Sequence, residues 1–110
     1  MIDTLCTVKA TRYTVSVMPD DEIAGSSFDV AVEYRGFDRW AVTRGSSCLS
    51  RSGEWEYEVQ PSSRDDEWLD EHRFTKDEAL AAAKDAAPLV VINGIRADEW
   101  AARKAAGAEW

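Results

Sequence analysis

The chain has 110 residues, with 13 lysines and arginines against 21 aspartates and glutamates, and its formal net charge is −8 at pH 7. This length suits one domain with a single hydrophobic core, and the composition excludes collagen, coiled coils and disulfide-dense scaffolds. The acidic balance argues against direct binding of nucleic acid, which needs clustered lysine and arginine, and no apolar run is long enough to span a membrane.

The first sixty residues alternate apolar and polar side chains, which is the period of a half-buried β-strand. This alternation predicts strands at residues 13–17, 28–34 and 40–44. A short loop around Gly36 separates the second strand from the third, so we expect these two strands to form a hairpin.

The fourth strand follows an interruption in the third. We interpret the glycine and serines at 45–47 as a bulge rather than a break, because Cys48 and Leu49 restore the apolar character. A turn at 51–53 then leads to a fourth strand at 54–59. Its inward-facing residues are expected to be Trp55, Tyr57 and Val59, and its solvent-facing residues Glu54, Glu56 and Glu58.

Beyond Pro61 the pattern changes to that of helices. Ser62 and Ser63 are candidate caps for a short acidic helix, whose inner side we expect to carry Trp68, Leu69 and His72. The segment at 75–78 reads Thr-Lys-Asp-Glu, a capping box that starts a longer helix. That helix is expected to end near Ala87, because Pro88 disfavours a helical residue before it.

The last part of the chain predicts a strand at 89–92, a turn at Asn93-Gly94 and a helix at 97–106 that ends at Gly107. Together the elements predict a single α+β domain over residues 1–110, with an N-terminal segment at 1–10 and a tail at 107–110. Its architecture is a mostly antiparallel meander of four or five strands, with two main helices packed on one face and a short acidic helix beside them.

Several segments share a family pattern: RYTVSV at 12–17, VEYRG at 32–36, WAVTR at 40–44, GEWEYE at 53–58, DEWL at 66–69, HRF at 72–74 and VING at 91–94. In this order they resemble small hypothetical proteins of actinobacterial phages and their hosts, over roughly residues 12–100. The family has no assigned activity, so the resemblance transfers no catalytic residue. It implies a phage or phage-derived accessory protein.

Negative charge is concentrated in one part of the chain. Ten acidic and three basic side chains lie between residues 54 and 78, so this segment carries nearly the whole excess of negative charge. The bland interpretation is a solvated face that keeps the protein soluble. The functional interpretation is a surface that binds a partner, formed by Glu54, Glu56, Glu58, Asp65, Asp66, Glu67, Asp70 and Glu71.

The sequence contains no motif of nucleophilic or phosphate-binding catalysis. A small enzyme that uses His72 or Cys48 is a minor alternative, because these residues form a nucleophile pair only if the fold brings them together. The two cysteines and one histidine lack zinc-site spacing, so we expect no metal and no cofactor.

The N-terminus carries Asp3 where a signal peptide has basic residues, so we expect a cytoplasmic protein. The family resemblance implies that this is the cytoplasm of a bacterial host cell. Reduced thiols at half-buried strand positions are then expected for Cys6 and Cys48, although a disulfide between them stays open. Trp110 is a candidate anchor for a partner or a dimer, since tryptophan is enriched at interface hot spots, and a frayed end is its alternative.

These observations predict a non-catalytic, acidic accessory protein that contacts a basic surface of a host or phage protein. One alternative is a DNA mimic that inhibits a nucleic-acid-binding or defence enzyme. Another is a small structural or assembly subunit, for which an exposed edge strand allows a homodimer.

Overall fold

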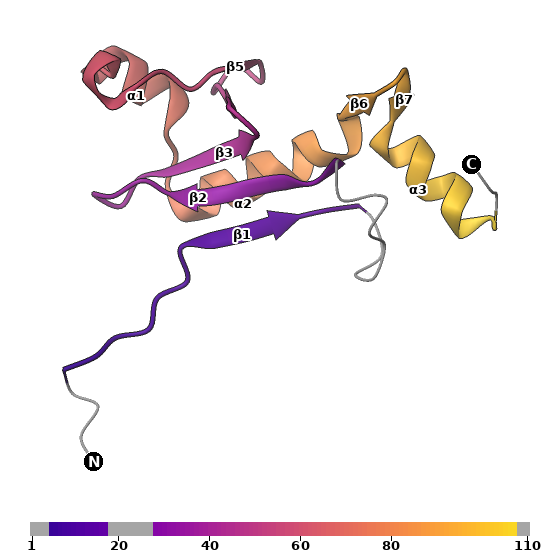
Figure 1. Cartoon of the computed structure of the whole chain (residues 1–110), viewed down its shortest axis with the longest axis horizontal. Coiled ribbons are helices and arrows are strands. Elements are labelled where there is room, and N and C mark those ends of the chain that lie inside the picture. Colours follow the sequence, from indigo (N-terminus) through magenta and orange to yellow (C-terminus); the bar gives the residue numbers. More distant parts are fainter. Residues whose placement is uncertain (1–4, 18–27, 108–110) are drawn as a thin grey trace.

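The computed structural model describes residues 5–17 and 28–107, so the candidate anchor Trp110 lies outside the described residues. Five strands form one antiparallel meander in the order β1-β2-β3-β4-β5 (Figure 1). The strands are β1 (Arg12–Val15), β2 (Val30–Tyr34), β3 (Trp40–Arg44), β4 (Ser47–Leu49) and β5 (Trp55–Tyr57). The predicted α+β class with an antiparallel meander is confirmed.

β3 and β4 are separate strands, so the interpretation of residues 45–47 as a bulge is wrong. Arg44 pairs with Ser47 across a two-residue turn, and Gly45 in that turn has a φ of 57°. Glycine adopts this left-handed conformation without the steric cost that a Cβ brings. The chain therefore reverses here, which places Cys48 opposite Thr43 and adds a strand to the sheet.

The second half of the chain is mainly helical. Its elements are η2 (Pro61–Ser63), α1 (Asp66–His72), α2 (Lys76–Ala86), η3 (Ala87–Leu89), the small hairpin of β6 (Val91–Ile92) and β7 (Ile95–Arg96), and α3 (Ala97–Ala105). The capping box of α2 is confirmed: Glu78 N–H donates to Thr75 Oγ1 at 3.2 Å, and Thr75 N–H donates to Glu78 Oε1 at 2.9 Å.

α1 begins later in the chain than expected from Ser62 and Ser63 as candidate caps. Ser62 and Ser63 lie in the preceding 3-10 turn, and Asp65 caps the helix by accepting the Trp68 N–H at 2.8 Å. An aspartate at this position satisfies one of the backbone donors that a helix start leaves without a partner.

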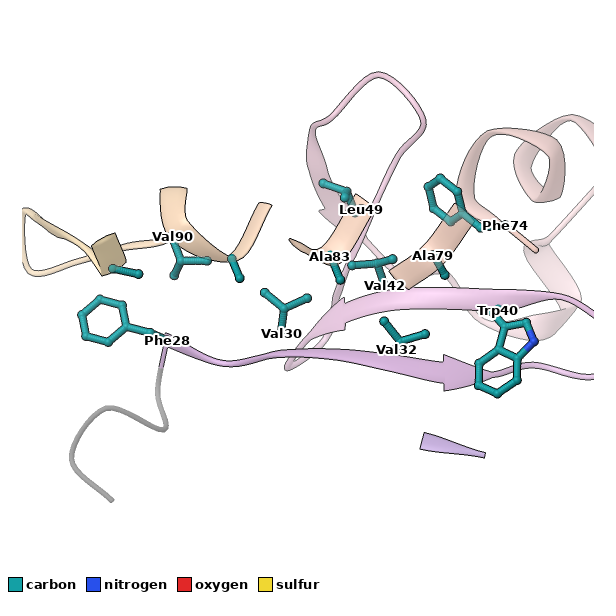
Figure 2. Packing of buried hydrophobic residues seen from close by; sticks show 12 residues of the cluster. Phe28, Val30, Val32, Trp40, Val42, Leu49, Phe74, Ala79, Ala83 and Val90 are labelled. Carbon is teal, nitrogen blue, oxygen red and sulfur yellow. The ribbon is translucent and has the colours of Figure 1, made fainter. Parts of the chain in front are cut away.

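The hydrophobic core lies between the sheet and α2 (Figure 2). Val30, Val32 and Val42 project from β2 and β3 and are fully buried. They meet Ala79 and Ala83 of α2, whose small side chains let the helix approach the sheet closely. Burying each valine contributes about 1.5–3 kcal/mol, so this layer supplies much of the stabilisation of the fold.

Two tryptophans, Trp100 and Trp55, are partly buried at the periphery of the core. Trp100 of α3 packs on Phe28 with 5.8 Å between ring centroids, beyond the end of α2. Trp55 is half-buried against the core, as predicted. Tyr57, however, is 64% exposed, so its predicted inward position is wrong. The reason is that α2 lies against β1, β2 and β3 and leaves the far edge of the sheet open.

α1 contacts the face of the sheet opposite α2. Because side chains alternate along a strand, Glu56 points away from the core face that its neighbour Trp55 occupies. His72 at the end of α1 contacts Glu56 on this second face. The link from α1 to α2 passes beside β3, where Phe74 and Trp40 exchange backbone hydrogen bonds of 2.8 and 2.9 Å.

Candidate protein-binding site

The three glutamates around β5 do not form one exposed row. Glu58 is only 15% exposed and forms ion pairs of 2.8 Å with both Arg35 and Arg73. Glu56 pairs with His72 and keeps about half of its exposure (47%). Glu54 is exposed. The prediction of a solvent-facing row is therefore wrong at Glu58, because two arginines from distant parts of the chain neutralise its carboxylate.

Glu58 belongs to a line of alternating charges across this face, which we call the charge ladder: Arg12, Glu33, Arg35, Glu58 and Arg73. Successive members are 2.8–3.1 Å apart. The Thr43 hydroxyl also donates to Glu33 at 3.1 Å. The ladder links β1 and β2 to the chain that follows β5 and to the segment between the helices.

The charge ladder keeps its carboxylates ionised. Burial acts to raise the pKa of Glu58, but the hydrogen bond and charge of Arg35, followed by the charge of Arg73, outweigh it, so the pKa lies below its usual 4.5. Burial likewise opposes ionisation of Glu33, and hydrogen bonds from Arg12 and Arg35 lower its pKa. Both glutamates thus act as structural anions.

An aromatic stack lies within α1, on its inner side. The rings of Trp68 and His72 lie 4.3 Å apart with an 18° angle between their planes, and the Arg73 guanidinium lies 4.9 Å from the centre of the Trp68 ring. His72 Nδ1 lies 2.8 Å from the Trp68 carbonyl oxygen and Nε2 faces Glu56. Because a carbonyl oxygen only accepts, Nδ1 donates in this contact. Trp68 and His72 therefore form the inner side of α1, as predicted.

The turn between β4 and β5 holds the C-terminal end of α1. Arg51 donates from its backbone N–H to Glu71 O and from Nε to Asp70 O, each at 2.8 Å. Its Nη2 donates to Arg73 O at 2.8 Å. The last carbonyls of a helix lack partners within the helix and favour a cation nearby, so Arg51 caps α1 from outside. The C-terminal end of α1 and its inner side are thus tied to the rest of the protein.

The outer side of α1 is acidic. Asp66, Glu67, Asp70 and Glu71 are all exposed, and their spacing places them on one side of the helix. None of these four side chains forms an ion pair within the described part of the chain. We define the acidic α1 surface as Glu54, Asp65, Asp66, Glu67, Asp70 and Glu71.

The structure thus exposes seven of the eight predicted partner-binding residues. Of these seven, Glu56 pairs with His72, and the eighth residue, Glu58, is paired with two arginines. Arg35 and Arg73, which pair with Glu58, and Arg51, which caps α1, were not identified from the sequence. One signal was readable, because Arg35 follows Glu33 at the i+2 spacing of a shared strand face. The pairing of Glu58 with Arg73 depends on the turn between α1 and α2 and had no local signal.

The thiols differ from the expectation of two half-buried strand positions. Cys48 is fully buried and Cys6 is exposed, and both are free. Burial raises the pKa of Cys48, and the charge of Glu58 adds to this effect while Arg73 opposes it. A buried thiol with a raised pKa is a poor nucleophile. Since His72 directs its ring nitrogens to other partners, this geometry lends no support to a Cys48–His72 nucleophile pair.

Within residues 5–17 and 28–107, no cluster of three or more histidine, cysteine, aspartate or glutamate side chains could hold a metal ion. Over the same residues, no helix has the length and apolar character needed to cross a bilayer. In comparisons with known proteins, no family model, no curated protein and no solved structure matches the chain.

Proposed function

We propose that this chain is a non-catalytic binding protein that contacts a basic surface of a protein partner through the acidic α1 surface. The observation that carries the proposal is the separation of two classes of carboxylate. Glu33 and Glu58 are neutralised by arginines on the face of the sheet opposite α2. The outer side of α1, in contrast, presents four acids without an ionic partner among the described residues.

The fixed position of α1 supports this role. A binding surface that is ordered before the partner arrives loses less conformational entropy on association. The contact of His72 with Glu56 and the capping contacts of Arg51 supply that order. A compact group of like charges also accelerates encounter with an oppositely charged surface, in a way that salt weakens.

The alternative function, DNA mimicry, has less support. That hypothesis relied on the regular spacing of Glu54, Glu56 and Glu58, and Glu58 is committed to Arg35 and Arg73. What remains is a short acidic helix with one neighbouring glutamate, which fits a local basic cluster better than a long track for DNA. An accessory role in the cytoplasm of a phage host is part of the proposal, supported by the motif resemblance.

Two double variants test the proposal with equal loss of charge. Asp66→Asn/Asp70→Asn neutralises the acidic α1 surface, and Asp77→Asn/Asp85→Asn neutralises exposed acids of α2 as the matched control. Asp66 and Asp77 both lie in the first turn of their helices, so the two variants lose similar helix-dipole stabilisation.

Affinity capture from an actinobacterial lysate identifies proteins retained by the wild-type chain, and the affinity of the purified partner is then titrated at two salt concentrations. We expect the α1 variant to lose about tenfold or more in affinity, the control to stay within about twofold, and salt to weaken the wild type. Equal losses of affinity in both variants would contradict the proposal and would indicate that the acidic α1 surface only keeps the protein soluble.

A further inference from the structure

β1 forms one edge of the sheet and its outer side is uncovered in the described part of the chain. Residues 5–10, which lead into β1, are all exposed and run away from the sheet rather than folding back along it (Figure 1). An uncovered strand edge presents backbone donors and acceptors to any other strand.

The hydrogen-bond pattern shows which residues of β1 face outward. Tyr34 N–H donates to Thr11 O at 2.9 Å, and the register places Tyr13 opposite Val32. Because the backbone groups of successive residues point to alternate sides of an antiparallel strand, Thr11 and Tyr13 bond to β2. The N–H and C=O groups of Arg12 and Thr14 point away from the sheet.

When two copies of β1 run antiparallel with Thr14 at the centre, the residues that face each other form favourable pairs. In this register Thr14 lies opposite the Thr14 of a second copy, and Tyr13 lies opposite Val15. Threonine pairs and pairs of an aromatic with a β-branched residue are favourable across strands, and no like charges face each other. A two-fold axis through Thr14 keeps the half-buried Tyr13 and Val15 of both copies on the α2 side of the joined sheet.

The opposite edge is a worse candidate for self-association. β5 has three residues and is flanked and interrupted by Glu54, Glu56 and Glu58. Two antiparallel copies of this segment would bring glutamates close to one another across the new strand pair, which is unfavourable. A contact of β1 with the β5 of another copy would be head-to-tail, so it would build a ring or an open chain of molecules rather than one symmetric interface.

We infer that the chain forms a two-fold symmetric homodimer in which the β1 edges of two copies pair about Thr14 and join their sheets. Since β1 and β5 are opposite edges, the two acidic α1 surfaces lie at the far ends of the joined sheet. The inference does not depend on the proposed function. A contact made by one short strand is small compared with the roughly 1,600 Å² of a standard interface, so the dimer is expected to be weak and concentration-dependent.

The test measures the mass of the full chain in solution by sedimentation velocity from micromolar to millimolar concentration. Thr14→Lys and Thr14→Glu each place like charges opposite each other at the two-fold axis, and each is expected to weaken dimerisation by about fivefold or more. An equimolar mixture of the two variants places opposite charges together and is expected to restore the dimer. Thr14→Val is the uncharged control.

Each outcome decides the inference. A dimer in the wild type that both charged variants weaken and their mixture restores supports pairing about Thr14. A wild-type chain that stays monomeric, or a dimer that the charged variants leave unchanged, overturns it. Growth beyond a dimer would indicate β1–β5 pairing and would also overturn it. Circular dichroism shows whether each variant is folded, and Thr14 is suited to substitution because its side chain is exposed.

Discussion

Arg73 and Glu58 are fifteen residues apart in the chain and form an ion pair of 2.8 Å in which the arginine side chain is only 3% exposed. Arg73 lies between α1 and α2, and Glu58 follows β5. Their contact ties the link between the helices to the sheet, and it removes Glu58 from the surface on which its position in the sequence had placed it.

Loss of the Glu58 carboxylate should destabilise the protein strongly. Glu58→Ala leaves the guanidinium of Arg73 buried without its anion, a change that typically costs about 3–5 kcal/mol. The free energy of unfolding from urea titration measures this cost. Glu54→Ala is the matched control, since Glu54 is exposed, and it should change stability by less than about 0.5 kcal/mol. Equal effects would show that the charge ladder contributes nothing to stability.

Acid should weaken the fold through the same pairs. The pKa values of Glu33 and Glu58 lie below the usual 4.5 in the folded protein, so the unfolded chain binds protons first as the pH falls. Their stabilising contribution is complete above pH 4.5 and is lost as the pH falls through the folded pKa values. Urea midpoints from neutral to acidic pH measure the loss, and Glu58→Gln should flatten the dependence. A wild-type stability that stays constant through this range would contradict the pKa shifts.

Local signals in the sequence were sufficient for α2, and distant partners explain where prediction failed. The capping box needs only Thr75 and Glu78, three residues apart, and it forms as predicted. The alternation of β5 correctly separated Trp55 from Glu56, but it could not reveal that α1 covers the glutamate face. Tyr57 is exposed because α2 lies against β1, β2 and β3 and leaves this edge of the sheet open. Alternation defines the two faces of a strand but does not reveal which helix covers each face.

The two thiols should differ in reactivity. Cys6 is exposed, whereas Cys48 is fully buried with a raised pKa, so a maleimide should modify Cys6 rapidly and Cys48 only after denaturation. Mass spectrometry of the native and denatured protein counts the modified residues. The Cys6→Ser variant is the control, because in its native state it keeps only the buried Cys48 and should remain unmodified. Rapid modification of Cys48 in that variant would reopen the hypothesis of a nucleophilic cysteine.

Loosening α1 should reduce partner binding without removing a single acid. His72→Phe keeps a ring against Trp68 but deletes the hydrogen bonds to the Trp68 carbonyl and to Glu56, at a cost of about 1–3 kcal/mol. Hydrogen exchange should accelerate in α1, while β2 and β3, which pack on α2, keep their protection.

Glu56→Gln separates this effect from a loss of charge. The glutamine still offers an oxygen to His72, so α1 should stay ordered although one negative charge is gone. If binding depends on an ordered acidic α1 surface, affinity for the captured partner should fall more in His72→Phe than in Glu56→Gln. The reverse order would mean that total charge matters and the position of α1 does not.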